Sequence, residues 1–438
     1  MKGFLIVILY MAAALIPVIY ASLYGYPYRN IVYEMGRNFA LLGFMILVLQ
    51  VFLASRIRWI ERPFGFDILI RYHRHMGIFA LLLVLSHPLL LASGSGNWGL
   101  VTGLNVSWHI WLGRVALVLL AVSIILSVYQ RPLGLTFERW RIIHDVLSPL
   151  VIVFAFIHSY LTGMDLNLAA MRVMWITGLA VVFLTFVYHR IIRPVLLRKH
   201  AYRVTEVIPE AEGVWTVKLA PQKGGPVFDY LPGQFQFITF FRGRNLPEEE
   251  HHWTISSSPA RREYVSSTIK ALGDFTSTIG ETRPGDTAAV HGAFGRFSYV
   301  LHPQERDLVF IAGGIGITPL MSMIRHMRDT KDNRSVLLLY ANRNEEQIVF
   351  ARELAEIEAG GHPSLRVVHV LSGPSPGWRG ETGLLGREKI RRLCGEDLQG
   401  KVFYVCGPPG LADSVVDALR SLNVADRQIR LEIFSFLD

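Results

Sequence analysis

The chain has 438 residues, a formal net charge of +9 at pH 7 and a hydrophobic fraction of 51%. A chain of this length has room for two or three domains. We exclude nucleic-acid binding because no nucleic-acid motif accompanies the positive charge. Only two cysteines occur, Cys394 and Cys406, so there is neither a disulfide framework nor a CxxCH attachment site.

The composition changes near His200. Before it, several apolar runs reach the length of a membrane span, whereas from Tyr202 onward charged residues, Gly and Pro occur as in an ordinary soluble α/β protein. The sequence therefore predicts a multidomain membrane protein. We place its domains at residues 1–199, 200–305 and 306–438.

Six apolar runs of about 20 residues can be read in the first domain, the length that a hydrocarbon core of roughly 30 Å requires. The first run contains Pro17 and leads into Tyr24 and Tyr26 rather than a small-residue cleavage site, so we interpret it as a retained span. The six predicted spans begin near Gly3, Gly36, Arg71, His109, Trp140 and Ala170.

The loops between the spans differ in charge. Segments 56–71, 131–141 and 190–199 are rich in Arg, whereas 91–107 has no Lys or Arg and 162–169 carries only Asp165 as a charged residue. By the positive-inside rule, both termini and the second half of the chain lie in the cytosol. The third and fifth spans then both run outward.

Four histidines lie in the third and fifth spans at equal spacing. His73 and His87 are 14 residues apart in one span, and His144 and His158 are 14 apart in the other. Fourteen residues leave a remainder of about 40° and rise about 21 Å, so each pair shares one helix face at two depths. His73 with His144 would bind one b-type haem near the cytosol, and His87 with His158 a second one near the outer side, through neutral imidazole nitrogens.

Other readings of these spans are weaker. A single buried histidine is commonly a hydrogen-bonded core residue, but four at matched spacing inside a membrane favour ligation. His75 is excluded because it lies about 120° round the helix from His87. A proton relay would need interleaved carboxylates, and only Asp145 at the cytosolic edge is present. Arg37 and Arg114, near the outer ends of spans two and four, are candidates for haem propionates, or else interfacial anchors.

Residues 202–302 alternate in short strands, such as 213–219 and 234–240, with Gly and Pro turns between them. This pattern predicts a small antiparallel barrel. Within it, segment 251–257 places hydroxyls and backbone amides beside an aromatic residue, which suits a flat ring with a ribityl and phosphate tail. A solvated strand end is the alternative reading.

Four segments of this domain, 232–235, 251–257, 269–276 and 292–297, together resemble the FAD-binding motifs of the ferredoxin-NADP reductase-like superfamily. In its transmembrane branch, the NADPH oxidase and ferric reductase family, the central motif resembles His-Pro-Phe-Thr followed by a hydroxyl-rich run. Here His251, Trp253 and Thr254 match, and His252 replaces the proline. The family's membrane domain also carries paired histidines on its third and fifth spans, where the spacing argument places them.

The resemblance implies an FAD site in the barrel. The residues implied for the flavin ring and its ribityl-phosphate chain are His251, Trp253, Thr254, Ser256 and Ser257. Those implied for the diphosphate and adenosine end are Lys270, Gly273, Thr276, Gly292 and Phe294.

From residue 307 the pattern becomes strand, Gly-rich turn, helix and strand, which is typical of a doubly wound nucleotide-binding α/β domain. The glycines after strand 308–312 would let a diphosphate approach the backbone and the start of the next helix. The candidate residues of this turn are Gly313, Gly314, Gly316, Thr318 and Pro319.

A second motif, at 405–410, also follows a strand and precedes a helix. In the reductase superfamily the two motifs flank the nicotinamide, so the resemblance places Cys406, Gly407 and Pro408 there, with Cys406 at the site of hydride transfer. A buried structural cysteine is the alternative. Arg343, after the second strand, can meet a ribose 2′-phosphate and favours NADPH, with NADH possible.

The C-terminal segment resembles the family's terminal strand, whose aromatic residue stacks on the flavin until nicotinamide displaces it. Phe434 is the preferred residue for this role, and Phe436 is the second candidate.

Together these features predict a multi-pass NADPH oxidase that passes electrons from cytosolic NADPH through FAD and two b haems to O₂, forming superoxide. The resemblance to prokaryotic members implies the cytoplasmic membrane of a prokaryote. A ferric-chelate reductase is the first alternative, but it should offer oxygen ligands, and the outer loops offer only Asp165. A subunit that donates electrons to a membrane partner or quinone is the second. No obligatory protein partner is evident, and the basic inner loops face anionic lipid.

Overall fold

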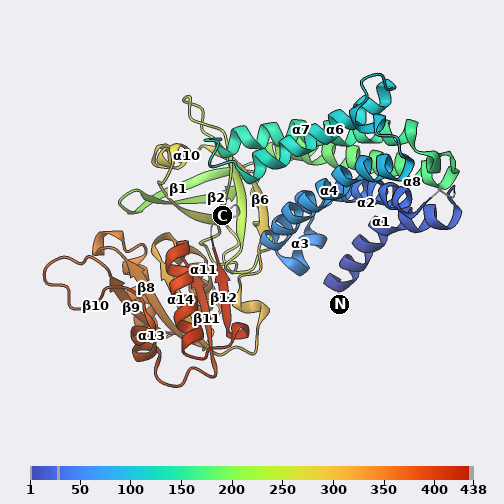
Figure 1. Cartoon of the computed structure of the whole chain (residues 1–438). Coiled ribbons are helices and arrows are strands. Elements are labelled where there is room, and N and C mark those ends of the chain that lie inside the picture. The colour runs from blue at the N-terminus through green and yellow to red at the C-terminus, as the bar shows by residue number, and fades with distance from the viewer. Residues whose placement is uncertain (1, 27–29, 434–438) are drawn as a thin grey trace. The chain divides into compact units, whose positions relative to one another are not determined.

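The structure is a computed structural model that describes residues 2–26 and 30–433 (Figure 1). The chain divides into two compact units, residues 1–193 and 194–438. The first unit is helical, and the second holds an antiparallel sheet followed by a parallel sheet covered by helices. The predicted fold class, a six-helix membrane bundle followed by an antiparallel barrel and a doubly wound α/β domain, is confirmed.

Within the described residues, six helices are long and apolar enough to cross a membrane. They are α1 (Lys2–Tyr24), α2 (Ile31–Ala54), α4 (Phe66–Ser95), α6 (Trp108–Val128), α7 (Phe137–Thr162) and α8 (Ala169–Val187). Shorter segments are α3 (Arg58–Phe64), α5 (Gly99–Thr102) and the 3-10 turn η1 (Met164–Asn167), and α8 continues through the π-helix η2 (Tyr188–Ile192) into α9 (Arg193–Lys199). The expectation of a multi-pass membrane protein is confirmed.

Two of the helices begin five residues before the predicted starts of the spans. The side chain of Asn30 caps α2 by accepting a hydrogen bond from the backbone N–H of Tyr33, which satisfies one of the free donors of the first turn. In α4, Asp67 lies in the first turn and pairs with Arg71 one turn later. Polar first turns of this kind extend a helix beyond the apolar stretch that hydropathy detects.

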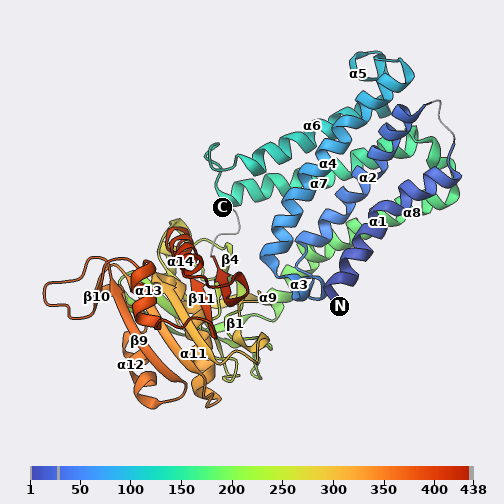
Figure 2. The ribbon, with the colours of Figure 1, turned by 60° about the horizontal axis from the view of Figure 1, so that its bottom comes forward.

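The membrane helices pack in pairs, with α2 along α4 and α6 along α7 (Figure 2). Small residues permit the close approach of α2 to α4. A Cβ atom added at Gly43 would lie 2.7 Å from a methyl group of Val84, and one added at Gly36 would lie 3.0 Å from Cβ of Leu90. Glycines at helix contacts in membranes act in this way because they bring two backbones together.

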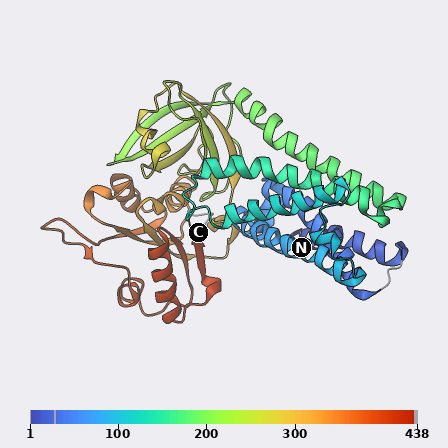
Figure 3. The same cartoon turned by 45° about the horizontal axis from the view of Figure 1, so that its top comes forward.

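The first sheet of the second unit is an antiparallel barrel of six strands (Figure 3). In sheet order the strands are β4 (Glu250–Thr254), β3 (Phe235–Phe241), β6 (Thr287–Phe294), β1 (Tyr202–Ala211), β2 (Val214–Pro221) and β5 (Val265–Lys270). A bridge between Ile255, just after β4, and Ser267 in β5 joins the two ends of this order. Short helical turns complete the domain: α10 (Asp274–Ser277), η3 (Ile279–Glu281) and η4 (Tyr299–Leu301).

The second sheet is parallel throughout. Its strands in order are β10 (Glu381–Thr382), β9 (Ser364–Leu371), β8 (Ser335–Asn342), β7 (Asp307–Gly313), β11 (Lys401–Cys406) and β12 (Ile429–Glu432). The helices are α11 (Ile317–Asp329), α12 (Ala351–Gly360), α13 (Arg387–Cys394) and α14 (Pro409–Ser421), with the 3-10 turns η5 (Gly314–Gly316), η6 (Glu345–Gln347) and η7 (Asp426–Gln428).

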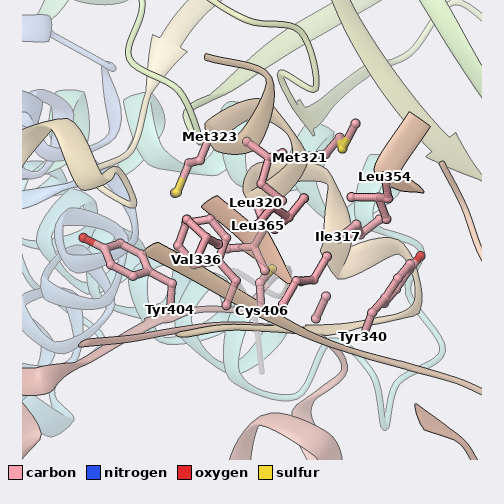
Figure 4. Packing of buried hydrophobic residues seen from close by; sticks show 14 of the residues in the cluster. Ile317, Leu320, Met321, Met323, Val336, Tyr340, Leu354, Leu365, Tyr404 and Cys406 are labelled. Carbon is pink, nitrogen blue, oxygen red and sulfur yellow. The ribbon is translucent and has the colours of Figure 1, made fainter. Parts of the chain in front are cut away.

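Alternate residues of β7 point to opposite faces of this sheet. Leu308 and Phe310 belong to a buried cluster with α11, whereas Val309 and Ile311 belong to a cluster with α13 and α14. Figure 4 shows the first cluster, in which residues of α11 pack over the sheet. The sequence of a strand that is buried on both faces is a continuous apolar run, and the sequence of β7 has this pattern.

Candidate functional site

The two predicted haem ligands of α4 turn their Nδ1 atoms toward α2. His73 Nδ1 lies 3.3 Å from the carbonyl oxygen of Gln50, and His87 Nδ1 lies 2.9 Å from the carbonyl oxygen of Gly36. The two acceptors are 14 residues apart, as the two histidines are. The equal spacing keeps both contacts on one face of each helix.

The two predicted ligands of α7 are held in the same way by α6. His158 Nδ1 lies 2.8 Å from the carbonyl oxygen of His109, and His144 Nδ1 lies 3.3 Å from the side-chain oxygen of Ser123. These acceptors are again 14 residues apart. All four histidines therefore have an oxygen partner on the helix that packs beside their own.

These contacts decide which ring nitrogen is available. At His73, His87 and His158 the partner is a carbonyl oxygen, which only accepts hydrogen bonds, so the ring proton lies on Nδ1 and Nε2 keeps its lone pair. The hydroxyl of Ser123 can accept from His144 in the same way. Among the described residues, no hydrogen bond to Nε2 of any of the four is recorded. Metal-bound histidines generally have this arrangement, with one nitrogen on the metal and the other donating to the protein. The residues therefore fit the noncovalent haems expected from their spacing.

The rings of His73 and His144 face each other across the bundle. Their centroids are 6.1 Å apart and their planes are inclined by 74°. When two imidazole rings bind one metal ion from opposite sides, each nitrogen–metal bond is about 2 Å long. The two bonds together with the distances from each nitrogen to its ring centroid give a centroid separation of this order. The structure thus brings together the pair that the sequence assigns to the cytosolic haem.

Two further residues shape the histidine positions. The indole of Trp140 stacks on the ring of His144 with centroids 5.4 Å apart, and its Nε1 donates to the hydroxyl of Ser127 at 3.1 Å. On α6, a Cβ atom added at Gly113 would lie 2.7 Å from the ring of His158. Sequence reasoning missed these residues, because neither carries a motif.

The remaining polar candidates of the membrane unit have protein partners. Arg37 lies 3.6 Å from Asp165 in a buried ion pair, and Arg114 donates to the carbonyl oxygens of Gly103 and Leu100 at 2.7 and 3.0 Å. Contact of either arginine with a propionate stays a prediction. His75 is exposed and bonds back to its own helix, at the carbonyl oxygen of Arg71.

Three of the four segments that resemble an FAD site lie side by side in the barrel. Strand β3 is the centre: Phe235 pairs with Thr254 of β4 and with Phe294 of β6. The amide of Gln234 also donates to the carbonyl oxygen of Gly295 at 2.8 Å, which ties the turn before β3 to the turn after β6. The fourth segment begins at the end of β5.

Within the 251–257 segment, the side chains differ in accessibility. His251 and Trp253 are half-buried, and both rings pack on Phe275. Ser256 and Ser257 are buried, and their hydroxyls bond to Ser266, Thr268 and Tyr230 inside the barrel. His251 and Trp253 are thus the more accessible members, and the flavin contacts of the two serines stay predictions.

The residues predicted around the diphosphate and adenosine lie at two places. Thr276 accepts hydrogen bonds from the backbone of Leu272 and Gly273, and so fixes the turn after β5. Gly292 packs against Gln236 and Phe228, where an added Cβ would come within 2.9 and 3.0 Å of them. Lys270 lines a small pocket that it shares with Gly314 of the nucleotide domain. Lys270 is therefore placed to reach a dinucleotide at the Gly-rich turn.

The two predicted nucleotide motifs touch each other. An added Cβ at Gly316 would lie 2.4 Å from the carbonyl oxygen of Cys406, and one at Gly313 would lie 3.0 Å from Pro408 and Leu411. Gly314 differs, because its φ is +52° and nothing lies within 4 Å of its added Cβ. Gly313 and Gly316 thus serve packing, and Gly314 leaves the backbone open to a ligand.

Cys406 lies at the end of β11 in the buried cluster under α11 (Figure 4). Its side chain is fully buried, and burial raises the pKa of its thiol well above the ordinary value. Burial thus favours the neutral thiol, and a role of Cys406 in shaping the hydride-transfer site stays a prediction. Cys394 is also buried, and burial raises its pKa to about 12.

Asn342, at the end of β8, places a buried amide at this edge of the sheet. Its side chain lines the same pocket as Gly314 and is only 8% exposed. An amide offers both a donor and an acceptor, so Asn342 can bond a polar ligand that enters the pocket. Arg343 follows directly and is exposed. Thr318 and Pro319 are buried in the first turn of α11.

Phe434 and Phe436 lie outside the described residues. Strand β12, which precedes them, pairs with β11 so that Glu432 lies opposite Cys406.

A group of charged residues that the sequence did not single out joins the two domains of the second unit. Arg325 of α11 donates to the carbonyl oxygen of Ser256 at 2.7 Å and forms two hydrogen bonds with Glu353 of α12. Arg328 also bonds Glu353, at 2.9 Å. Burial alone would raise the pKa of Glu353, but these two arginines outweigh it and hold the pKa below its ordinary value.

Comparison with known families identifies a domain in each half of the chain. Residues 39–155 match the ferric reductase like transmembrane component, and residues 310–417 match the oxidoreductase NAD-binding domain. The first match contains all of His73, His87 and His144, and the second contains both nucleotide motifs. The predicted ferric reductase-like membrane domain and NAD-binding domain are confirmed, and the domain boundaries stay predictions.

Curated relatives match the second half of the chain. An NADH-cytochrome b5 reductase-like protein of Arabidopsis thaliana is 28% identical over 166 residues, which cover 37% of this chain and 50% of that protein. The glycine betaine monooxygenase reductase subunit of Chromohalobacter salexigens is 31% identical over 231 residues, covering 51% of this chain and 61% of that subunit. The chain thus spans less than two thirds of each relative.

Solved structures resemble the same half. The FAD/NAD-binding domain of nitric oxide dioxygenase from Vibrio cholerae is 24% identical, with a TM-score of 0.46, over 54% of this chain and 98% of that one. A ferredoxin NADP⁺ reductase from Neisseria gonorrhoeae is 19% identical, with a TM-score of 0.45, over 53% and 97%.

Proposed function

We propose that this chain, whose residues 39–155 match a ferric reductase like transmembrane component and whose residues 310–417 match an oxidoreductase NAD-binding domain, carries electrons across a membrane from NADPH, through FAD and two b haems, to O₂ on the outer face. The product is superoxide. One observation carries the proposal: four histidines at two depths, each with Nδ1 bonded to a neighbouring helix and Nε2 left for a metal, in a chain that also holds an NAD-binding domain.

The residues of the second unit bind and orient the two nucleotides. Gly314 leaves its backbone open to the diphosphate of the nicotinamide nucleotide, and Lys270 and Asn342 line the same pocket. Arg343 supplies a positive charge for a ribose 2′-phosphate, which favours NADPH over NADH. Trp253 and Thr254 face the flavin. When bound, FAD takes up two electrons as a hydride and releases them singly, which nicotinamide cannot do.

The residues of the membrane unit hold the haems. His73 and His144 would bind the inner haem, and His87 and His158 the outer haem, each through Nε2. The 14-residue spacing separates the two depths by about 21 Å along the helix, so the two sites lie in different leaflets.

The choice of acceptor rests on the state of the one carboxylate in the loop between α7 and α8. An iron reductase should offer carboxylate oxygens to a hard cation. The carboxylate of Asp165 is only 3% exposed and lies in the ion pair with Arg37, so it is not available as a ligand. This supports O₂, a neutral molecule that needs no ligand set, over a ferric chelate.

The proposal is tested with the purified full-length protein in lipid nanodiscs, supplied with FAD and either NADPH or NADH. We expect a two-haem b-type spectrum, faster oxidation of NADPH than of NADH, and cytochrome c reduction that superoxide dismutase suppresses. Ferric-chelate reduction without a dismutase effect would make the protein a ferric reductase instead. If neither acceptor is reduced while the haems are, a membrane partner or quinone is the acceptor.

A further inference from the structure

The four acceptors that meet the histidine Nδ1 atoms differ in kind. Gln50, Gly36 and His109 offer backbone carbonyl oxygens, which every residue possesses, whereas Ser123 offers its side-chain hydroxyl to His144. Within this set, only the acceptor of His144 can be removed by a substitution. His144 is therefore the one candidate ligand among the four whose Nδ1 contact depends on the identity of a side chain.

Serines inside helices usually bond a carbonyl oxygen one turn earlier in their own helix. Three others in the membrane unit do so: Ser86 bonds Leu82, Ser95 bonds Leu91 and Ser127 bonds Ser123. The hydroxyl of Ser123 instead has the imidazole of His144, on another helix, as its recorded partner. Ser123 is also only 6% exposed, so water does not compete for this contact.

Residues near Ser123 also position the imidazole of His144, on a second side of the ring. Ser127, which lies one turn after Ser123 on α6, accepts a hydrogen bond from the indole N–H of Trp140. Trp140 lies one turn before His144 on α7, and its indole stacks on the imidazole of His144. Two serines of α6 thus contact two aromatic rings of α7. The imidazole of His144 has the hydroxyl of Ser123 at its edge and the indole of Trp140 on its face.

A hydrogen bond to Nδ1 affects a metal bound at Nε2. With Nε2 on a metal, the ring proton is on Nδ1, so Ser123 must accept it. Such a bond orients the ring and raises the basicity of the ligand. A more basic ligand stabilises the ferric over the ferrous state and lowers the midpoint potential, which is one of the means by which a protein tunes a haem.

We propose that Ser123 is a positioning residue for His144, and that through this contact it lowers the midpoint potential of the inner haem without affecting the outer one. This inference rests on the haem ligation of the proposed function. According to this inference, one hydroxyl sets the midpoint potential of the inner haem, the first haem to receive an electron, independently of the outer haem.

The test is a spectroscopic redox titration of the full-length protein in nanodiscs. In Ser123→Ala we expect two haems, with one midpoint raised and the other unchanged. Loss of such a partner typically weakens metal binding by about tenfold or more, and a tenfold loss confined to the ferric state raises a one-electron midpoint by about 59 mV. The electron paramagnetic resonance signal of one ferric haem should shift as its imidazole turns.

Ser123→Cys provides a second variant if Ser123→Ala does not accumulate, because a thiol fills similar space but accepts hydrogen bonds weakly. Ser123→Thr, which keeps the hydroxyl, should restore the wild-type midpoint. Ser86→Ala is the matched control, since it removes a hydroxyl from α4 that contacts only its own helix.

Each outcome separates the inference from the proposed function. Wild-type protein that binds no b haem overturns both. Two haems whose midpoints are unchanged in Ser123→Ala, or shifted equally, overturn the role of Ser123 and leave the proposed function intact. Loss of one haem in Ser123→Ala, with the other retained at its normal midpoint, supports the positioning role.

Discussion

At the scale of single residues, the role of a histidine depends on which of its ring nitrogens the protein occupies. His75 and His73 lie two residues apart on α4, yet His75 bonds its own helix and His73 bonds α2. Only the second arrangement turns Nε2 toward the interior of the bundle. The same criterion selects all four predicted ligands.

Gly113 is predicted to be essential for the outer haem. In Gly113→Ala the new methyl group would lie 2.7 Å from the ring of His158, so the ring must move, at a cost of about 1–3 kcal/mol for overpacking. We expect the purified variant to bind about one haem instead of two, as measured by the pyridine haemochrome spectrum per mole of protein.

Gly178→Ala is the matched control for this prediction. Gly178 lies in α8, which carries none of the four histidines, and its added Cβ would lie 3.8 Å from a methyl group of Val48, an ordinary contact distance. The substitution should leave two haems and, because alanine favours helices, should not lower stability. Full haem content in Gly113→Ala would contradict the prediction.

The sequence singles out the candidate ligands but not the residues that hold them. The 14-residue spacing is visible because histidine is rare inside membranes, whereas three of the four acceptors are backbone carbonyls and leave no mark in a sequence. Residue type alone says less about hydroxyls. Ser256 and Ser257 are predicted beside the flavin, and their hydroxyls bond within the barrel, so a flavin contact of these two serines stays a prediction.

At the scale of elements, α11 joins the barrel to the nucleotide domain through the hydrogen bond from Arg325 to the carbonyl oxygen of Ser256. Glu353 of α12 fixes the guanidinium from the other side. The segment predicted to face the flavin is thus tied to the helix that follows the Gly-rich turn. Charge pairs between separate elements of this kind depend on the fold and cannot be read from the sequence.

We predict that Glu353 stabilises this junction in a pH-dependent way. Because its pKa is lowered in the folded protein, its contribution is present above the ordinary pKa of 4.5 and is lost as the pH falls through the folded value. Glu353→Gln should therefore destabilise α11 and α12 by about 2 kcal/mol at pH 7, measured by hydrogen exchange of the full chain in detergent. The difference from wild type should shrink below pH 4.5.

Glu356→Gln is the control on the same helix. Glu356 pairs with Arg352 one turn away, but both side chains are largely exposed, and such pairs contribute only about 0.5 kcal/mol. Its exchange rates should be close to those of wild type at every pH. A Glu353→Gln effect that stays constant with pH would contradict the assigned role.

The order and type of the elements were largely predictable, whereas their first residues were not. Hydropathy located all six spans, but α2 and α4 begin five residues earlier, because Asn30 caps α2 and Asp67 in the first turn of α4 pairs with Arg71. The strands of the second unit were located by alternation and by turn residues. The pairing of β3 with both β4 and β6, which gathers the flavin segments, required the three-dimensional sheet order.

At the scale of the whole molecule, the change in composition near His200 separates the two proposed chemistries, hydride transfer in the second unit and single-electron transfer in the first. We predict that the two can be uncoupled. His87→Ala should remove the outer haem and lower superoxide formation by about 100-fold, while NADPH-dependent reduction of ferricyanide by the flavin domain is retained.

His75→Ala is the matched control, because it removes a histidine from the same helix at an exposed position that bonds only its own backbone. Both activities should then remain at the wild-type level. Loss of ferricyanide reduction in His87→Ala would mean that the membrane histidines are needed for the second unit to function, contrary to the uncoupling.

The pairing of the membrane helices has a consequence for biogenesis. The pair α2–α4 and the pair α6–α7 each carry one histidine for each haem, so neither pair completes a site by itself. A ligand that binds only the assembled state stabilises it by mass action. We therefore expect the cell's haem supply to determine how much of the newly made protein escapes membrane proteolysis.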